Sequence, residues 1–390
     1  MICRATGMLT ASLAFFALAS AATGHAEEQR HHALSLIGEP QYSADFKHFN
    51  WVNPDAPKGG ALRVAGLGSY DSFNPFSIKG EVANGARSLL YDTLMDGSPD
   101  EPSTAYGLVA EWVSYPDDFS SATFRLREGA KFHDGEPVKV EDVIFSMELL
   151  KKINPLYKYY YKNVLSGEKT GERQVTFKFD MKGNRELPLI LGDLPILPKH
   201  YYEEEGSDGK LRDLSKTTMV PPLGSGPYVI KDFKPGREVT YERAKDYWAK
   251  GLPVRRGLYN VDSIRYIYFK DRTPAFEAFL SGQIDYWQES SANAWATRYN
   301  TDSVKSGKIR KEELAHGRVA PMQAFVLNTR REQFKDPRVR RALNLAFDFE
   351  ELNKSLFYGM YKRVGSYFDN SELKASGLPQ GRELELLEQF

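Results

Sequence analysis

The chain has 390 residues, which is long enough to bury a large core and to form two or more domains. Lysine plus arginine equals aspartate plus glutamate, 52 of each, so no basic face is predicted and nucleic acid is not expected as a partner. Aromatic residues make up 13% of the chain; we expect them to pack in the core, with lining of a ligand site as the alternative.

The start of the chain has the pattern of an export signal. Arg4 supplies a positive charge, residues 8–22 are apolar or small, and residues 24–26 read Gly-His-Ala before Glu27. We therefore predict a cleaved signal peptide over residues 1–26 and a mature protein in the periplasm. An uncleaved membrane anchor is the alternative, although the apolar run is short for a membrane span.

Cysteine and histidine usage argues against disulfides and metal sites. Cys3 is the only cysteine and precedes the apolar run, so the mature chain is expected to contain none, as suits a bacterial periplasmic protein with a large core. The seven histidines show no His-Glu-x-x-His or other zinc spacing. We expect no metal and no cofactor.

A glycine-containing loop follows the first predicted strand. Residues 61–65 form that strand, and residues 66–71 read Gly-Leu-Gly-Ser-Tyr-Asp. A dinucleotide fingerprint is rejected here, because Asp71 replaces its third glycine and Pro75 stands where the phosphate-binding helix should run. The glycines instead indicate a close approach of the backbone to another segment or to a ligand. A helix is predicted afterwards, over residues 86–94.

A strand, a turn and an amphipathic helix are predicted next. Residues 123–126 alternate as in a half-buried strand, Asp134 and Gly135 form a tight turn, and residues 140–150 place apolar side chains on one helical face. Acidic residues in the first turn and lysines after the last suit the helix dipole. His133 is interpreted as part of the turn rather than as a ligand.

The middle of the chain predicts further strands. Residues 174–179 alternate, and residues 228–230 and 239–241 form a hairpin after a backbone bend at 224–226. Ser225 lies between two glycines, as in a nucleophile elbow. The elbow needs glycine two residues earlier, where this chain has Leu223, so Ser225 is not predicted to be catalytic.

The last third begins with a predicted crossover. Strand 264–269 leads to a helix that starts at Thr273 and Pro274 and stops at Gly282, and strand 284–287 follows, which indicates an α/β lobe. Residues 325–328 are predicted as a strand. Two helices are then expected, the first capped at Asp336 and Pro337 and the second at Asp348.

Four segments carry a resemblance to a known family: residues 124–146, 223–236, 246–248 and 328–348, which read FRLREGAKFHDGEPVKVEDVIFS, LGSGPYVIKDFKPG, DYW and NTRREQFKDPRVRRALNLAFD. They resemble the family 5 extracellular solute-binding proteins, which bind peptides, nickel complexes and related solutes for ABC importers. Residues 32–60 are more narrowly similar to the Yej-type oligopeptide-binding proteins, a branch also associated with uptake of peptide-nucleotide microcins.

The resemblance implies an α/β fold, the two-lobed clamp of class II periplasmic binding proteins with an extra subdomain. Lobe I would comprise residues 27–85 and 200–318, the inserted subdomain residues 86–199, and the start of lobe II residues 319–390. Family members are usually longer, so we expect the second lobe to be incomplete here. The expected partners are an oligopeptide or peptide-like solute and the permease subunits of an ABC transporter in the inner membrane.

Such a protein is expected to be a monomer and to bind without catalysis. Two rivals stay open: a secreted hydrolase acting on peptides or glycans, and a binder of a non-peptide solute such as an opine, a sugar–amino-acid conjugate or a metal chelate. A hydrolase would form product, whereas a binder would be stabilised by its ligand without turnover.

The candidate ligand-binding residues follow predicted strands, because ligands of open α/β sheets bind beyond the carboxyl ends of strands. Core packing is the alternative for Tyr70 and Trp287. No residue is predicted to pair with the amino terminus of a peptide. The candidates are Gly68, Ser69 and Tyr70 after the first strand, Trp287, Gln288 and Glu289 after the crossover, and Phe325 to Asn328 at the lobe junction.

Overall fold

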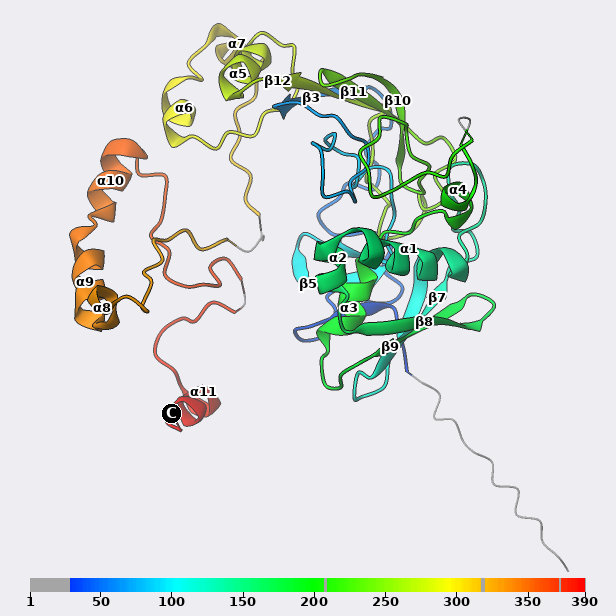
Figure 1. Cartoon of the computed structure of the whole chain (residues 1–390). Helices are drawn as coiled ribbons and strands as arrows, with labels where there is room; N and C mark the ends of the chain where they lie inside the picture. Colours follow the sequence, from blue (N-terminus) through cyan, green and yellow to red (C-terminus); the bar gives the residue numbers. More distant parts are fainter. Residues whose placement is uncertain (1–28, 207–208, 317–319, 372, 390) are drawn as a thin grey trace, which may run out of the picture.

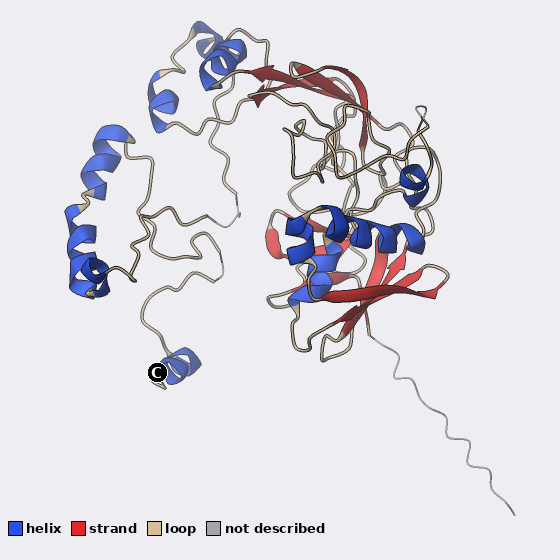
Figure 2. Cartoon of the chain, viewed as in Figure 1, coloured by secondary structure: helices blue, strands red, loops and turns tan. Residues whose placement is uncertain are grey.

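The computed structural model describes residues 29–206, 209–316, 320–371 and 373–389 (Figure 1). The predicted signal peptide therefore lies outside the described residues, as does the predicted start of lobe II at residue 319. The described part of the chain contains helices and strands, and the strands form three sheets (Figure 2).

A four-stranded sheet forms the part predicted as lobe I, in the order β10-β11-β12-β3. The first three strands are antiparallel neighbours, and β12 and β3 run parallel. The predicted hairpin and the strands predicted over 61–65 and 264–269 are confirmed. The strands are β3 (Ala61–Leu67), β10 (Tyr228–Lys234), β11 (Glu238–Arg243) and β12 (Ser263–Phe269).

The crossover after β12 is confirmed only in part. Helix α5 (Arg272–Leu280) forms, with the Asp271 carboxylate accepting from the Thr273 N–H at 3.0 Å. The strand predicted over 284–287 is wrong, because only one parallel bridge forms, between Val64 and Tyr286. The reason lies in Asp285, whose carboxylate accepts from the backbone N–H of Arg63 at 2.7 Å and so occupies a donor that a longer ladder would use.

The helix predicted over residues 86–94 is also wrong, since this segment is a run of turns. The carbonyl groups of this segment accept hydrogen bonds from a distant part of the chain. The Leu90 carbonyl accepts from the N–H groups of Ser225 and Gly226 at 3.0 and 2.9 Å, and the Leu89 carbonyl accepts from Tyr228 at 3.0 Å. A long-range loop thus takes the acceptors that a helix needs.

A five-stranded antiparallel sheet has the order β1-β6-β7-β9-β8; four of its strands lie in the part predicted as an inserted subdomain, and β1 comes from the segment predicted as lobe I. Helix α1 (Val140–Ile153) packs on it through Val143, Met147 and Leu150, which confirms the predicted apolar face. The strand predicted over 174–179 is confirmed. The strands are β1 (Arg30–His31), β6 (Ala110–Ser114), β7 (Ser121–Leu126), β8 (Val164–Gly171) and β9 (Gln174–Phe179).

A small third sheet has the order β2-β5-β4, with β2 (Ala33–Ser35), β4 (Met95–Ser98) and β5 (Glu101–Gly107). A continuous apolar core includes Tyr70 and Tyr228 from the first sheet region and Phe124 and Leu150 from the second. The domain boundaries given above remain predictions. Three short helices complete this part: α2 (Pro155–Tyr160), α3 (Glu186–Gly192) and α4 (Lys199–Glu203).

The C-terminal part lies apart from the sheets (orange to red in Figure 1). The caps predicted at Asp336 and Asp348 are confirmed, since their carboxylates accept from the N–H groups of Arg338 and Glu351 at 2.8 and 3.0 Å. The helices from residue 292 onward are α6 (Ala292–Thr297), α7 (Asp302–Lys305), α8 (Glu332–Lys335), α9 (Pro337–Ala346), α10 (Phe349–Leu356) and α11 (Gly381–Leu387).

The strand predicted over 325–328 is wrong. Phe325 is 86% exposed, and the described residues offer this segment no backbone to pair with. A strand is stable only beside a neighbour that satisfies its N–H and C=O groups, so local pattern alone does not produce one. Within the described ranges, no helix is long and apolar enough to span a bilayer.

Candidate functional site

The structure brings two of the three predicted residue groups to one sheet edge. β3 ends at Leu67, its parallel neighbour β12 ends at Phe269, and Tyr286 bridges to β3 in the same direction. The Gly68 N–H donates to the Phe269 carbonyl at 2.8 Å, with Gly68 in the left-handed region at φ +80°. Gly68 and the segment that begins at Trp287 therefore both lie toward the carboxyl edge of the sheet.

Ser69 and Tyr70 contact the β10–β11 turn. The Ser69 hydroxyl donates to the Gly236 carbonyl at 3.3 Å, and the Tyr70 hydroxyl donates to the Glu238 carbonyl at 2.6 Å. The Tyr70 ring lies 4.9 Å from that of Tyr268 and the residue is 2% exposed. Tyr70 therefore packs in the core, and a side-chain contact with ligand stays an untested prediction.

Glu289 organises the second group. Its carboxylate accepts from the Trp287 indole at 3.2 Å, from the Tyr299 hydroxyl at 3.1 Å and from the Ser291 N–H at 2.8 Å. Burial would raise the pKa of Glu289, but these hydrogen bonds outweigh burial and hold the pKa below its ordinary value. The Arg272 guanidinium covers the Trp287 ring at 4.7 Å. Glu289 thus fixes the Trp287 loop, while Gln288 remains exposed.

The third group lies elsewhere. The Asn328 amide oxygen accepts from the Arg330 N–H at 3.1 Å and forms a local turn, and the Phe325 ring contacts Phe347 at 6.2 Å. In the described part of the chain, no hydrogen bond or ring contact joins residues 325–328 to the other two groups. Their role in binding stays a prediction.

The structure also contains a pocket that the sequence did not predict. It has a volume of about 620 Å³, within the range of small-molecule sites. Its residues are spread over more than 200 positions of the chain, so no local motif marks them. Among the described residues no cluster of three or more His, Cys, Asp or Glu side chains could hold a metal ion. The lining residues used below are Trp51, Val82, Arg87, Asp96, Asp193 and Arg255.

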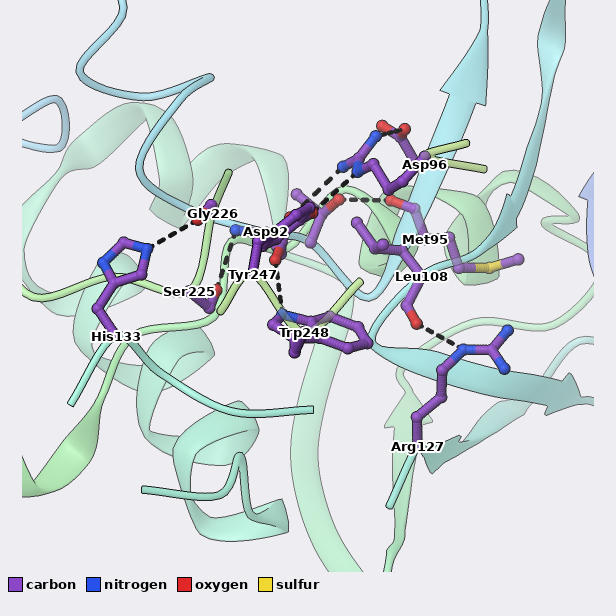
Figure 3. A network of polar contacts seen from close by, with 12 residues as sticks. Asp92, Met95, Asp96, Leu108, Arg127, His133, Ser225, Gly226, Tyr247 and Trp248 are labelled. Carbon is purple, nitrogen blue, oxygen red and sulfur yellow. Dashed lines mark hydrogen bonds and ion pairs between the residues drawn. The ribbon is translucent and has the colours of Figure 1, made fainter. Parts of the chain in front are cut away.

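A buried polar network lies behind one wall of this pocket and reaches it through Asp96 and Arg255. Asp92 accepts hydrogen bonds from the Tyr247 hydroxyl at 2.8 Å and the Trp248 indole at 2.9 Å (Figure 3). The Arg255 guanidinium lies 3.5 Å from Asp92 and also pairs with Asp96. The network accounts for Tyr247 and Trp248 of the DYW motif, which tie this loop to Asp92.

Burial raises the pKa of Asp92 to about 6, although Arg255 and the hydrogen bonds from Tyr247 and Trp248 oppose the shift. An acid with a raised folded-state pKa stabilises the protein most below its unfolded pKa, near 4, and this contribution is lost as the pH rises to about 6. We therefore expect the stability of the wild type relative to Asp92→Asn to decrease between pH 4 and pH 6. Urea unfolding of both proteins across this range measures the difference, and a relative stability that rises with pH would contradict it.

Ser225 and His133 hold the 224–226 bend against the chain. Ser225 is 1% exposed, and its hydroxyl oxygen accepts from the Asp92 N–H at 3.1 Å. The His133 ring donates through Nε2 to the Gly226 carbonyl at 2.7 Å, and burial lowers the pKa of His133 (Figure 3). Both polar groups are therefore used in structural hydrogen bonds.

A free main-chain edge borders the pocket at Val82. The Ser72 N–H donates to the Glu81 carbonyl at 3.2 Å and the Ala83 N–H donates to the Ser72 carbonyl at 2.8 Å, which makes a parallel bridge between Ser72 and Val82. Val82's own N–H and C=O point away from this bridge. Neither group has a hydrogen-bond partner among the residues that the structure describes.

Comparison with known proteins identifies the family. The model of the bacterial extracellular solute-binding proteins, family 5 Middle, matches residues 104–386. A relative in Agrobacterium fabrum, the probable peptide-binding protein YejA, is 51% identical over 359 residues, which cover 92% of this chain and 58% of the relative.

Two solved structures are similar in fold. The NikA protein of Brucella suis in complex with Fe(III)-EDTA matches with a TM-score of 0.63 and 22% identity, over 82% of this chain and 61% of that one. The oligopeptide-binding protein AppA of Bacillus subtilis in complex with a nonapeptide matches with a TM-score of 0.54 and 23% identity, over 78% and 57%. The predicted fold class is thereby confirmed.

The chain spans less than two thirds of the length of the curated relatives it matches here, 58% in the case of YejA of Agrobacterium fabrum. The family model nevertheless covers most of the chain, from the small third sheet to the C-terminal helix. This chain belongs to the family 5 bacterial extracellular solute-binding proteins.

Proposed function

We propose that the protein is the periplasmic solute-binding component of an ABC importer, that it captures oligopeptides or peptide-like solutes, and that it delivers them as a monomer to a membrane permease. Its family consists of extracellular solute-binding proteins, and its relative in Agrobacterium fabrum is named a probable peptide-binding protein. The proposal includes export by the predicted signal peptide and binding without catalysis.

The observation that carries the proposal is the free main-chain edge at Val82 beside the 620 Å³ pocket. A peptide presents the same N–H and C=O groups whatever its sequence. Pairing with Val82 would satisfy those groups as an added strand does, while the adjoining pocket accepts side chains of differing size. Main-chain pairing at Val82 combined with a pocket for varied side chains suits a protein that binds many different peptides.

Lobe closure would add to the affinity. Apolar surface removed from water contributes about 25 cal/mol per Å². The sheet edge at Gly68 and Trp287 and the residues around Phe325 remain the predicted contacts in the closed form. The solute shifts the clamp only by its preference for the closed state, so closure and affinity are linked.

The proposal is tested by calorimetry on the protein expressed from its complete reading frame, titrated with a pool of short peptides. We expect binding heat and a thermal stabilisation that grows as RT ln(1 + [L]/Kd), about 2.7 kcal/mol at a hundredfold excess over Kd. Val82→Pro removes the free N–H and is expected to weaken binding, whereas Val82→Ala keeps the main chain and serves as the matched control.

Three outcomes would contradict the proposal. Heat with an opine or a metal chelate but not with peptides would favour a non-peptide solute. A cleaved product would favour the hydrolase. Equal affinities of Val82→Pro and Val82→Ala would remove the main-chain edge from the site.

A further inference from the structure

Helix α2 is held on the inserted subdomain by its inner face. Tyr157 and Tyr161 lie one turn apart on this face; Tyr161 is fully buried, and the Tyr157 ring lies 6.2 Å from that of Phe76. The Asn154 side chain donates to the Phe76 carbonyl at 2.9 Å and accepts from the Leu156 N–H at 2.9 Å. The start and the inner side of the helix are therefore fixed by the core.

The outer side of the same helix is apolar and exposed. Leu156, Tyr159 and Tyr160 stand at positions i, i+3 and i+4, so they share one side of the helix. They are 76%, 71% and 44% exposed. Neither tyrosine hydroxyl has a hydrogen-bond partner within the described ranges. Large apolar side chains gathered on a fixed, exposed surface are typical of a site that contacts a partner.

Lysines flank these apolar side chains. Residues 151–163 read KKINPLYKYYYKN, with four lysines and no carboxylate. Lys158 and Lys162 are exposed, and neither makes an ion pair with another residue that the structure describes. The Lys162 Nζ lies 4.4 Å from the centre of the Tyr159 ring. We call this surface the α2 face; it consists of Leu156, Lys158, Tyr159, Tyr160 and Lys162.

Acidic groups are found near one margin of the α2 face. Burial raises the pKa of Tyr160, the charges of Asp193 and Glu186 add to this shift, and Arg87 opposes it. Asp193 is itself paired with Arg87 at 3.8 Å. The margin at Tyr159, where Lys162 lies, keeps its positive charge without an ion-pair partner.

The composition of the α2 face favours a membrane surface over a protein partner. Lysine is depleted in protein–protein interfaces, whereas tyrosine and lysine are both common where a protein meets lipid headgroups. A tyrosine ring can lie among the headgroups with its hydroxyl in water, and a lysine can bury its stem while its charge reaches a lipid phosphate. Each lysine close to an anionic lipid surface strengthens binding about fivefold.

We propose that the α2 face binds the surface of an anionic phospholipid bilayer. Leu156, Tyr159 and Tyr160 enter the headgroup region, and Lys158 and Lys162 pair with lipid phosphates. No residue of the α2 face lines the pocket bordered by Trp51, Val82 and Arg255. The membrane contact is therefore separate from solute binding and does not depend on the proposed function.

The test is flotation of the protein, expressed from its complete reading frame, with vesicles of phosphatidylcholine alone or mixed with an equal part of phosphatidylglycerol. We expect binding to the anionic vesicles only. This binding should be lost when salt is raised from about 0.1 M to about 1 M, because the screening length falls from about 10 Å to about 3 Å.

Two double variants separate the charged from the apolar contribution. Lys158→Gln with Lys162→Gln is expected to weaken binding to anionic vesicles about thirtyfold, and Leu156→Ser with Tyr159→Ser about tenfold or more. The matched control is Lys305→Gln with Lys308→Gln, which changes the net charge equally at exposed positions in and after α7, away from α2 in Figure 1. The control should bind as the wild type does.

Each possible result decides for or against the α2 face. Absence of wild-type binding to anionic vesicles overturns the inference, and so does equal binding by the Lys158/Lys162 and Lys305/Lys308 variants, once circular dichroism shows that both are folded. If no vesicle binds but the Lys158/Lys162 variant lowers solute uptake by cells, the α2 face contacts a protein and the inference is wrong. Calorimetry with the peptide pool is expected to give the same heat for all variants, so the proposed function is tested independently.

Discussion

Replacing Asp92 by alanine is expected to lower the free energy of unfolding by about 3–5 kcal/mol, the usual cost of removing one partner from a buried charged network. The substitution leaves the Arg255 charge, in a site where the side chain is 8% exposed, with Asp96 as its remaining carboxylate partner. It also removes the acceptor of the Tyr247 hydroxyl and of the Trp248 indole, so both donors lose their partner in a largely buried site.

Urea unfolding followed by tryptophan fluorescence measures this loss, because Trp248 lies in the network. Asp117→Ala changes an exposed carboxylate of the same subdomain and is expected to stay within about 0.5 kcal/mol of the wild type. Asp92→Asn keeps one hydrogen-bond acceptor, so its free energy of unfolding should lie between those of Asp92→Ala and Asp117→Ala. A loss of stability for Asp92→Ala no larger than that of the control would show that the network does not hold the loop to the subdomain.

Gly224→Ala is expected to lower the free energy of unfolding by about 3 kcal/mol or more, at the upper end of the range for overpacking. A Cβ at this position would lie 1.9 Å from the Leu90 carbonyl oxygen. That oxygen belongs to the backbone and accepts hydrogen bonds from Ser225 and Gly226 at 3.0 and 2.9 Å, so it cannot move without breaking them. The hydrogen bond from Asp92 to Ser225 would be disturbed as well.

Gly129→Ala is the matched control, since a Cβ there has no heavy atom within 4 Å. Its free energy of unfolding is expected to stay within about 0.5 kcal/mol of that of the wild type. The two variants are compared by circular dichroism in urea. Equal stabilities would mean that the 90–92 and 224–226 segments separate easily, which would also weaken the role assigned to the Asp92 network.

The elements that the sequence predicted well have local causes. Helix α1 follows from one apolar face and suitable charges at both ends, and helices α9 and α10 begin at Asp336 and Asp348, whose carboxylates cap them. The β10–β11 hairpin follows from alternation on both sides of a short turn. Each of these signals lies within a few residues of the structure it produces.

The failed predictions involve partners far along the chain. Residues 86–94 have helical spacing, but the carbonyls of Leu89 and Leu90 bond to the 225–228 segment. The strand after α5 is cut short because Asp285 bonds to Arg63, 222 positions away. Residues 325–328 have strand character without a described neighbour to pair with. Periodicity cannot reveal which distant group will occupy a donor or acceptor.

The residues of the candidate site also fall into two sets, those that could be placed from the sequence and those that could not. Gly68 and Trp287 could be placed near a sheet edge because Gly68 lies just past the first predicted strand and Trp287 is the last residue of the segment predicted after α5. The pocket could not, since Val82, Asp96, Asp193 and Arg255 come from separate segments with no shared motif.

By itself, the sequence determined the family, the α/β class, the main strands and the capped helices, because these depend on residue type and short spacing. Only the tertiary structure decided that Asp92 and Arg255 share a buried polar network, and which main-chain groups remain open at Val82. The physical reason is that hydrogen bonding and charge balance depend on distances across the folded chain, and folding sets those distances for the whole molecule at once.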